Sequence, residues 1–465
     1  MRQMIIILFL SSSVSADLLK HAKEYLGVST EVKNLNYNFE AQKISQLSEE
    51  LSRSWNLTLS ETYSDSDLDK GPFTFSAPGE KTKTTYLSLE KENIYGGEFT
   101  LSGTYYDFDG KASDGSPRSI KSYSQELKYT QYLGANFLGR VSKLELRIKE
   151  KETQYQKVSL AGVKSKELLE FVNNYIDLQR DLTLKKLSDK AYKRSQARLN
   201  LVSRQVKDGL KEKVDLLSTK NSHFGQREQQ KVAGQQLKSS KNLLEAKLER
   251  KVVLDEVSSF KIKNINLDPI EKKSIANNID MKSIEAKLDY LEDEIAKNKK
   301  SVFPTIALSA TYETNNFETT KSPILDGTIG SDNVNKEIAL SVVIPIGYDA
   351  QKNALKIASL NKLHATYEKK IIKNRIEKRL ETLMSALDVL DQNIESVVNR
   401  YNLAVSSLKE YNRLYSRGRV SLDQVIRAEE DLINTEKSFV QFKVEREKSY
   451  YSLLDLYGEL VQEFL

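Results

Sequence analysis

Apolar residues recur at a fixed spacing in the C-terminal part of the chain, where they advance in alternating steps of four and three. A sustained 3.5-residue period is typical of coiled-coil packing, in which one narrow seam is buried against neighbouring helices. A single amphipathic surface helix would drift off a strict seven-residue period within a few heptads. We therefore predict a coiled-coil helix whose seam consists of Ile376, Leu380, Leu383, Leu387, Leu390, Ile394, Val397, Tyr401, Ala404, Leu408, Tyr411 and Tyr415.

The positions of the seven prolines leave two long tracts, residues 118–268 and 346–465, without any proline. Because proline inside a helix removes a backbone donor and clashes with the preceding turn, uninterrupted helices can run only in such tracts. We predict long helices over 139–207 and 349–416, each roughly 100 Å long at 1.5 Å per residue. Gly162 is expected to interrupt the first of them.

A glycine follows each predicted long helix, and a further helical stretch follows each glycine. Gly209 precedes a helix predicted over 210–255, and Gly418 precedes one over 420–463. Glycine just past a helix end is the usual left-handed cap. Both glycines are therefore predicted to mark tips where the chain turns back.

Strand patterns also occur in both halves of the chain. Residues 55–63 and 304–312 alternate apolar and small polar residues. This alternation suits a strand with one face against lipid or a core and the other against water. Further strands are predicted at Thr85–Glu90, Glu98–Tyr106, Gln125–Tyr132 and Lys336–Pro345, with a tight hairpin turn at Asn93–Gly97 and solvent loops at Ser64–Lys83, Asp107–Lys121 and Glu313–Asn335.

The order of elements therefore repeats along the chain. Such a repeat is stronger evidence for the architecture than any single motif. The predicted first repeat, 17–268, holds a helix, strands within 55–132, the long helix 139–207, a tip near 209 and the helix 210–255. The predicted second repeat, 269–465, holds a helix at 272–302, strands within 304–345, the long helix 349–416, a tip near 418 and the helix 420–463. The hairpin from Thr85 to Tyr106 has no counterpart in the second repeat.

The first sixteen residues are predicted to be a secretory signal peptide. Arg2 supplies a charged start, residues 4–10 are apolar, and Val14, Ser15 and Ala16 are the small residues of a cleavage site. The mature chain would then begin at Asp17. A buried N-terminal strand is the alternative interpretation.

Composition narrows the possible chemistry. The chain has no cysteine, so disulfides and thiolate metal sites are excluded. Its 71 basic and 65 acidic residues interleave without a basic stripe, so we do not expect nucleic-acid binding. No run of 18 apolar residues occurs, and therefore no transmembrane helix is predicted. Three scattered histidines and the absence of phosphate-loop or His-Glu-x-x-His motifs predict no enzyme, metal site or cofactor.

Three sequence features together carry a resemblance to a known family. They are Phe303-Pro304 before a strand, Pro345-Ile346-Gly347 before a long helix, and the tip sequence 418–429, of which 209–217 is a weaker version. In this order and spacing, the mature chain resembles the TolC family of outer-membrane efflux proteins. The resemblance implies a mainly α fold with a transmembrane β-barrel contribution, in which two tandem structural repeats build a long α-helical coiled-coil barrel and a trimeric β-barrel.

The resemblance also implies a function and partners. A homotrimer would form a channel-tunnel from outer membrane to periplasm, exporting substrates from a tripartite efflux pump or a type I secretion system. Its partners would be outer-membrane lipid, a periplasmic adaptor (membrane fusion protein), and an inner-membrane pump or secretion ATPase. The alternative is a periplasmic coiled-coil adaptor or structural protein with a soluble β-domain, which would carry one helical hairpin rather than a duplicated order.

Candidate site residues follow from the same resemblance. The docking tips would include Gly209, Leu210, Gly418, Arg419 and Val420. The tunnel entrance of family members often holds acids at the positions six and nine residues after the tip glycine. In this chain those positions are occupied by Asp215, Ser218, Gln424 and Arg427. Only Asp215 is acidic, so an ion pair between Asp215 and Arg427 could replace an acidic ring, or these residues could form a solvated face; Asp423 stands one position early.

The strands carry the remaining candidates. Leu57, Leu59, Ile306 and Leu308 are expected to face lipid. The family pattern is four strands per protomer, which the extra hairpin exceeds. This hairpin could join the barrel and widen it to eighteen strands, or fold over one end.

Overall fold

The computed structural model describes residues 16–67, 79–111, 116–254, 275–318, 333–344 and 346–464. Residues 1–15 of the predicted signal peptide, Pro345 and the central parts of the three predicted loops lie outside these ranges. The chain divides into two compact units. The first unit contains residues up to 39, 157–283 and 369–465, and the second unit contains 40–156 and 284–368. Each unit therefore combines segments from both halves of the sequence.

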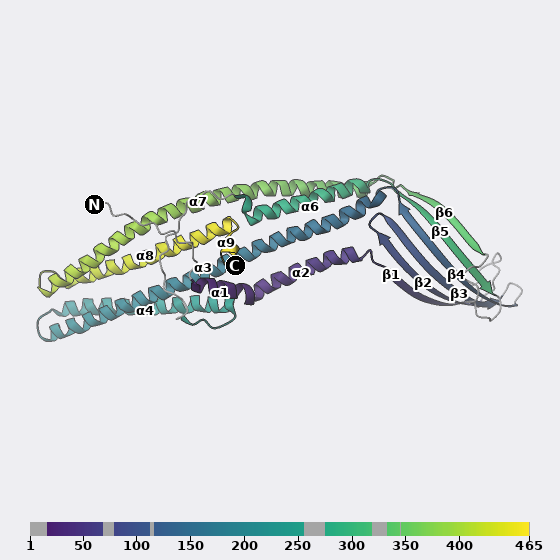
Figure 1. The fold of residues 1–465 in the computed structure, drawn as a ribbon. Coiled ribbons are helices and arrows are strands. Elements are labelled where there is room, and N and C mark those ends of the chain that lie inside the picture. The colour runs from purple at the N-terminus through teal and green to yellow at the C-terminus, as the bar shows by residue number, and fades with distance from the viewer. Residues whose placement is uncertain are drawn as a thin grey trace. The chain divides into compact units, whose positions relative to one another are not determined.

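Helices form most of the described chain (Figure 1). The two longest, α3 (Arg140–Lys207) and α7 (Asp349–Ser416), each contain 68 residues. Both lie in the tracts without proline, where every backbone donor can join the helical ladder. The others are α1 (Ala16–Val28), α2 (Thr30–Leu51), η1 (Phe137–Gly139), α4 (Lys213–Leu248), η3 (Ile275–Asn277), α6 (Ile279–Ser301), α8 (Leu422–Leu456) and α9 (Leu460–Phe464).

Gly162 does not interrupt α3, contrary to the expectation from sequence. The helix continues through this position, and a Cβ atom there would lie 3.2 Å from Cγ2 of Ile279. The glycine therefore permits close packing against the start of α6 in the first unit. At Gly162, the gap in the hydrophobic pattern therefore marks a close contact between two helices and not an interruption of α3.

Aromatic side chains form much of the core of the first unit. The rings of Tyr25 from α1 and Phe171 from α3 stack with centroids 4.5 Å apart, and both side chains are fully buried. The rings of Tyr451 from α8 and Phe464 from α9 lie 5.8 Å apart. Burying each such ring contributes about 1.5–3 kcal/mol, so these contacts hold α1 to α3 and α9 to α8.

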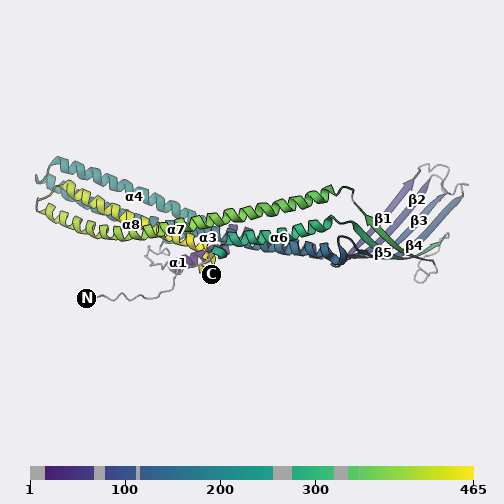
Figure 2. The same ribbon diagram turned by 90° about the horizontal axis from the view of Figure 1, so that it is seen from above.

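The second unit contains one antiparallel sheet of six strands in the order β1-β2-β3-β4-β5-β6. The strands lie side by side in both views (Figure 1; Figure 2). The extra hairpin, β2 and β3, lies inside the sheet between β1 and β4 and is not folded over one end. The strands are β1 (Asn56–Ser66), β2 (Glu80–Asn93), β3 (Gly97–Lys111), β4 (Pro117–Tyr132), β5 (Thr305–Glu318) and β6 (Val334–Val343).

The strands extend further into the polar segments than the sequence predicted, so the predicted loops were too long. β1 continues to Ser66 and β3 to Lys111, while β2 begins at Glu80. Charged side chains at these ends do not prevent pairing, because Nζ of Lys81 lies 3.1 Å from the carboxylate of Asp65, its partner in the β1–β2 register. Opposite charges facing each other across strands stabilise the extended pairing.

The predicted turn at Asn93–Gly97 is confirmed, and it packs tightly on the connection between β4 and α3. Gly96 has φ +73°, and its carbonyl accepts a hydrogen bond from the Tyr132 amide at 2.9 Å. A Cβ atom on Gly139 would lie 1.7 Å from the carbonyl oxygen of Ile94. No side chain fits there, so the glycine fixes the hairpin turn against the start of α3.

Candidate functional site

Strand register sorts the side chains of the sheet onto two different faces. Leu57 pairs with Leu89, Leu89 with Leu101, and Leu101 with Leu127. Since alternate residues of a strand point to the same side, all four residues predicted to face lipid share this face. We call it the apolar face; its apolar members include Leu57, Leu59, Leu87, Leu89, Phe99, Leu101, Leu127, Tyr129, Ile306, Leu308, Ile338, Leu340 and Val342.

The apolar face is open in the single chain. Leu57 and Leu59 are each 69% exposed, and Ile338 is 80% exposed. Contiguous exposed apolar surface marks contact with a partner or a membrane. The residues predicted to face lipid come only from β1 and β5, so the contributions of β2, β3, β4 and β6 to this face were not predicted, although an alternation of period two could have indicated them.

The opposite face is lined by short hydroxyl side chains. We call it the polar face. Ser88 is almost fully buried, and most other side chains of β2 to β4 on this face are partly shielded. Its hydroxyl members include Thr58, Ser60, Thr62, Thr82, Thr84, Ser88, Thr100, Ser102, Thr104, Ser122, Ser124, Ser309, Thr311 and Ser341.

The sheet ends at β1 on one side and β6 on the other. Within the described ranges, β1 pairs only with β2, and β6 pairs only with β5. An edge strand presents a row of backbone donors and acceptors that another strand can use. The two edges therefore offer ladders to further strands.

The two predicted tips in the first unit have the same backbone motif. After α3, the amide of Gly209 donates to the Val206 carbonyl at 3.2 Å, and the amide of Leu210 donates to Gln205 at 2.8 Å. Gly418 and Arg419 repeat both bonds, at 3.0 Å each, with the carbonyls of Tyr415 and Leu414. Gly209 has φ +72° and Gly418 φ +69°, so both turns are Schellman motifs that require the left-handed conformation.

The helices that follow the tips begin differently. Ser421 caps α8, because its hydroxyl accepts from the Gln424 amide at 3.4 Å and Gln424 Oε1 accepts from the Ser421 amide at 2.9 Å. Glu212 stands at the equivalent position before α4 and makes no such side-chain bond. Gln424, a predicted entrance residue, is therefore engaged in a capping box.

Among the described residues, Asp215 and Arg427 make no ion pair with each other. Nε of Arg427 lies 2.9 Å from Asp423, one turn earlier in α8, and both side chains are exposed. The half-buried Asp215 lies in the first turn of α4, where its carbonyl accepts from the Thr219 hydroxyl at 2.8 Å. In the part of the chain that is described, Arg427 thus pairs with Asp423 instead of Asp215.

A small apolar cluster holds the two tips together. Val202 of α3 is buried against Leu422 and Ile426 of α8. Nζ of Lys211, in the first tip, lies 4.6 Å from the ring centre of Tyr415 in α7. Leu210 is 71% exposed, so the first tip presents an apolar side chain that no residue of the described chain covers.

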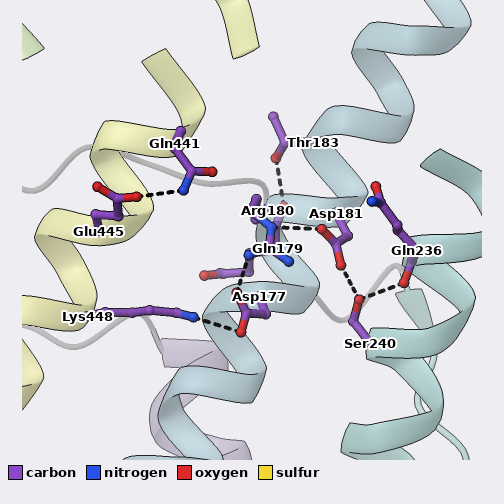
Figure 3. Close-up of polar contacts among 10 residues, drawn as sticks. All are labelled: Asp177, Gln179, Arg180, Asp181, Thr183, Gln236, Ser240, Gln441, Glu445 and Lys448. Carbon is purple, nitrogen blue, oxygen red and sulfur yellow. Dashed lines mark hydrogen bonds and ion pairs between the residues drawn. The ribbon is translucent and has the colours of Figure 1, made fainter. Parts of the chain in front are cut away.

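Ion pairs tie the helical hairpins together behind the tips. Lys448 of α8 lies 2.7 Å from Asp177 of α3 (Figure 3). Asp181, which is buried, accepts from the hydroxyl of Ser240 in α4 and pairs with Arg180 at 2.8 Å. α3 is therefore bonded to both α4 and α8 by charged groups, which fixes their relative rotation.

Closer to the tips, two arginines of α3 converge on one acid of α8. Arg194 lies 2.8 Å from the buried carboxylate of Glu429, and Arg198 contacts its other oxygen. Burial lowers the pKa of Arg198, and the like charge of Arg194 adds to this effect. Leaving such a carboxylate without its partners would be costly, so the cluster fixes α8 on α3.

The described residues contain no group of three or more histidine or acidic side chains arranged to hold a metal ion. Within the same ranges, none of the helices is both long and apolar enough to span a membrane.

Comparison with solved structures identifies proteins of the same fold. CusC, described as forming a transmembrane channel, shares 15% identity with this chain at a TM-score of 0.70, covering 97% of this chain and 95% of CusC. The outer membrane protein VceC of Vibrio cholerae shares 13% identity at a TM-score of 0.71, covering 95% and 96% of the two chains. The CmeC outer membrane channel of Campylobacter jejuni shares 12% identity at a TM-score of 0.71, covering 98% of this chain and 90% of CmeC.

The chain therefore has the fold of these outer-membrane proteins along nearly its whole length. The predicted fold class is confirmed, and the resemblance to the TolC family is confirmed as a likeness of fold. Sequence comparison with protein-family models and with curated proteins gives no match.

Proposed function

We propose that this chain is one protomer of a homotrimeric outer-membrane channel that carries substrates out across the periplasm and the outer membrane. The observation that carries the proposal is the six-stranded sheet, with one apolar face, one hydroxyl-lined face and two edge strands that pair with no further strand of the described chain. The similarity of fold to outer-membrane channels supports it.

The sheet has the properties that a barrel wall in a membrane needs. Lipid cannot satisfy backbone hydrogen bonds, so a sheet in a bilayer must close on itself. One six-stranded sheet is too small to enclose a water-filled lumen, whereas three copies joined β1 to β6 would form a barrel of eighteen strands. The apolar face would then contact lipid, and the polar face would line the lumen.

The helical hairpins would continue the conduit into the periplasm. Their tips would dock on a periplasmic adaptor of an inner-membrane pump or of a type I secretion ATPase. The paired Schellman turns at Gly209 and Gly418 and the exposed Leu210 support a docking role, because they present backbone and one apolar side chain at the end of a hairpin. The inner-membrane partner would supply the energy, and the channel itself would be a passive route rather than an enzyme.

The test is extraction of the full-length protein from membranes with detergent, followed by light scattering and electron microscopy. We expect particles with three copies of the chain, a barrel at one end and helical tips at the other. A soluble monomer or dimer that needs no detergent would contradict the channel and would favour the periplasmic adaptor.

A further inference from the structure

The two faces of the sheet differ in charge as well as in polarity. The register places seven carboxylates and two basic residues on the polar face, so acidic groups dominate it. The carboxylates belong to Glu80, Glu90, Glu92, Glu98, Glu126, Glu313 and Glu337, and the basic groups to Arg118 and Lys128.

On the apolar face, in contrast to the polar face, acidic side chains do not outnumber basic ones. Lys81 lies 3.1 Å from Asp65, and Lys83 lies 2.8 Å from Glu61, so basic and acidic groups there form ion pairs between neighbouring strands. The described side chains on this face include six lysines, at 81, 83, 91, 111, 121 and 336, and four acids, Glu61, Asp65, Asp107 and Asp109. The excess of negative charge is thus specific to the polar face.

Two carboxylate pairs on the polar face lie directly opposite each other. Glu92 of β2 pairs in register with Glu98 of β3, and Glu126 of β4 with Glu313 of β5. Like charges at directly opposed positions destabilise a sheet. Pairing of opposite charges, as on the other face, would have avoided this cost, so sheet stability does not account for the arrangement.

The additional hairpin supplies more than half of this charge. Glu80, Glu90 and Glu92 lie on β2, and Glu98 lies on β3. The last three stand at the end of the sheet from which the chain enters α3, next to the fixed turn at Gly96. The hairpin that exceeds the four-strand pattern therefore adds a group of acids at one end of the polar face.

We propose that the polar face makes the channel selective for cations, so that positively charged solutes pass in preference to anions. The inference rests on the proposed function, because it takes the polar face as the wall of a lumen. In a trimer, each carboxylate would recur three times around the lumen. Rings of acidic side chains on a low-dielectric wall concentrate cations and repel anions.

The test is the reversal potential of the purified trimer in a planar lipid bilayer, with potassium chloride at different concentrations on the two sides. We expect the wild-type channel to favour potassium over chloride several-fold. The variant E92Q/E98Q/E126Q/E313Q should lose most of this preference. Because it removes opposed like charges, its fold should be at least as stable as that of the wild type.

The matched control removes the same number of carboxylates from the apolar face, in the variant E61Q/D65N/D107N/D109N. We expect its reversal potential to equal that of the wild type. If this control is unstable, the single substitution D109N serves the same purpose. A wild-type channel without cation preference, or an unchanged reversal potential in the polar-face variant, would overturn the inference. Failure of the wild-type protein to form any channel would instead contradict the proposed function.

Discussion

Single buried charges in the first unit have opposite effects on its stability. Glu429 is buried, but two arginines of α3 compensate its charge. Lys443 of α8 is also buried and lies 4.1 Å from the ring centre of Phe439. Burial lowers the pKa of Lys443 to about 8, and Glu447 opposes this shift only in part. The sequence shows both residues as ordinary helix charges, so only their packing distinguishes them.

Lys443 predicts a dependence of stability on pH. Its pKa falls from 10.5 in the unfolded chain to about 8 in the fold, so between these values the unfolded chain binds more protons. The free energy of unfolding should therefore rise as pH increases from 8 to 10.5. Lys443→Met should be more stable at pH 7 and should lose this rise, as measured by denaturant unfolding at several pH values. An identical pH profile in wild type and variant would contradict the assignment.

At the scale of elements, the environment of a strand residue depends on the face to which it points, and the turn at a tip depends on the backbone conformation of its glycine. Neither depends on a single chemical group. A strand changes face with every residue, so neighbouring positions meet different surroundings. A tip glycine is needed for its positive φ and not for space, since a Cβ atom on Gly418 would meet nothing within 4 Å. Each feature allows a substitution to be compared with a nearly identical control.

Leu308 tests the lipid-facing assignment. Leu308→Arg should impair insertion and trimer assembly in the outer membrane, because arginine on a lipid-facing strand costs about 2–4 kcal/mol near the middle of the bilayer. Ser309→Arg places the same side chain on the polar face and should assemble normally. The yield of detergent-extracted trimer measures both. Equal yields would show that the two faces do not differ in environment.

Gly418 tests the tip. Gly418→Val places a β-branched residue at φ +69°, which costs about 1–2 kcal/mol, and should weaken adaptor coupling without preventing trimer assembly. Gly225→Val is the control, because Gly225 also has open space but stands within α4 at an ordinary helical φ. Co-purification with the adaptor and export by an active pump are the measurements. Full coupling by the Gly418 variant would contradict the docking assignment.

At the scale of the whole molecule, the number of strands per chain determines the proposed pore. β2 and β3 lie between β1 and β4, and every neighbouring pair is antiparallel. Removing both strands would leave β1 and β4 antiparallel and able to pair. The architecture therefore permits a barrel with four strands from each chain.

Replacing residues 67–116 by a short turn should give a narrower channel. Barrel diameter grows roughly in proportion to strand number, so twelve strands instead of eighteen would reduce the cross-section, and with it the single-channel conductance, to roughly half. Conductance in a planar bilayer measures the change. An undiminished conductance would mean that β2 and β3 do not enlarge the lumen.

The sequence by itself determined the long helices and the glycine turns. A seven-residue repeat and the absence of proline depend only on neighbours along the chain, and the predicted 349–416 agrees with α7 (Asp349–Ser416). Turn glycines are equally local, because a positive φ excludes most other residues. These features required no knowledge of what packs against them.

Only the tertiary structure decided how the strands are used. Strand ends such as Glu80 and Lys111 are polar, and the ladder extends to them because a neighbouring strand satisfies their backbone groups. The place of the β2–β3 hairpin depends on the Gly139 contact with Ile94, 45 residues apart in sequence. The excess of acids on the polar face likewise depends on the register of six strands from two distant segments. Such pairings are set by long-range hydrogen bonds, for which a single sequence carries no local signal.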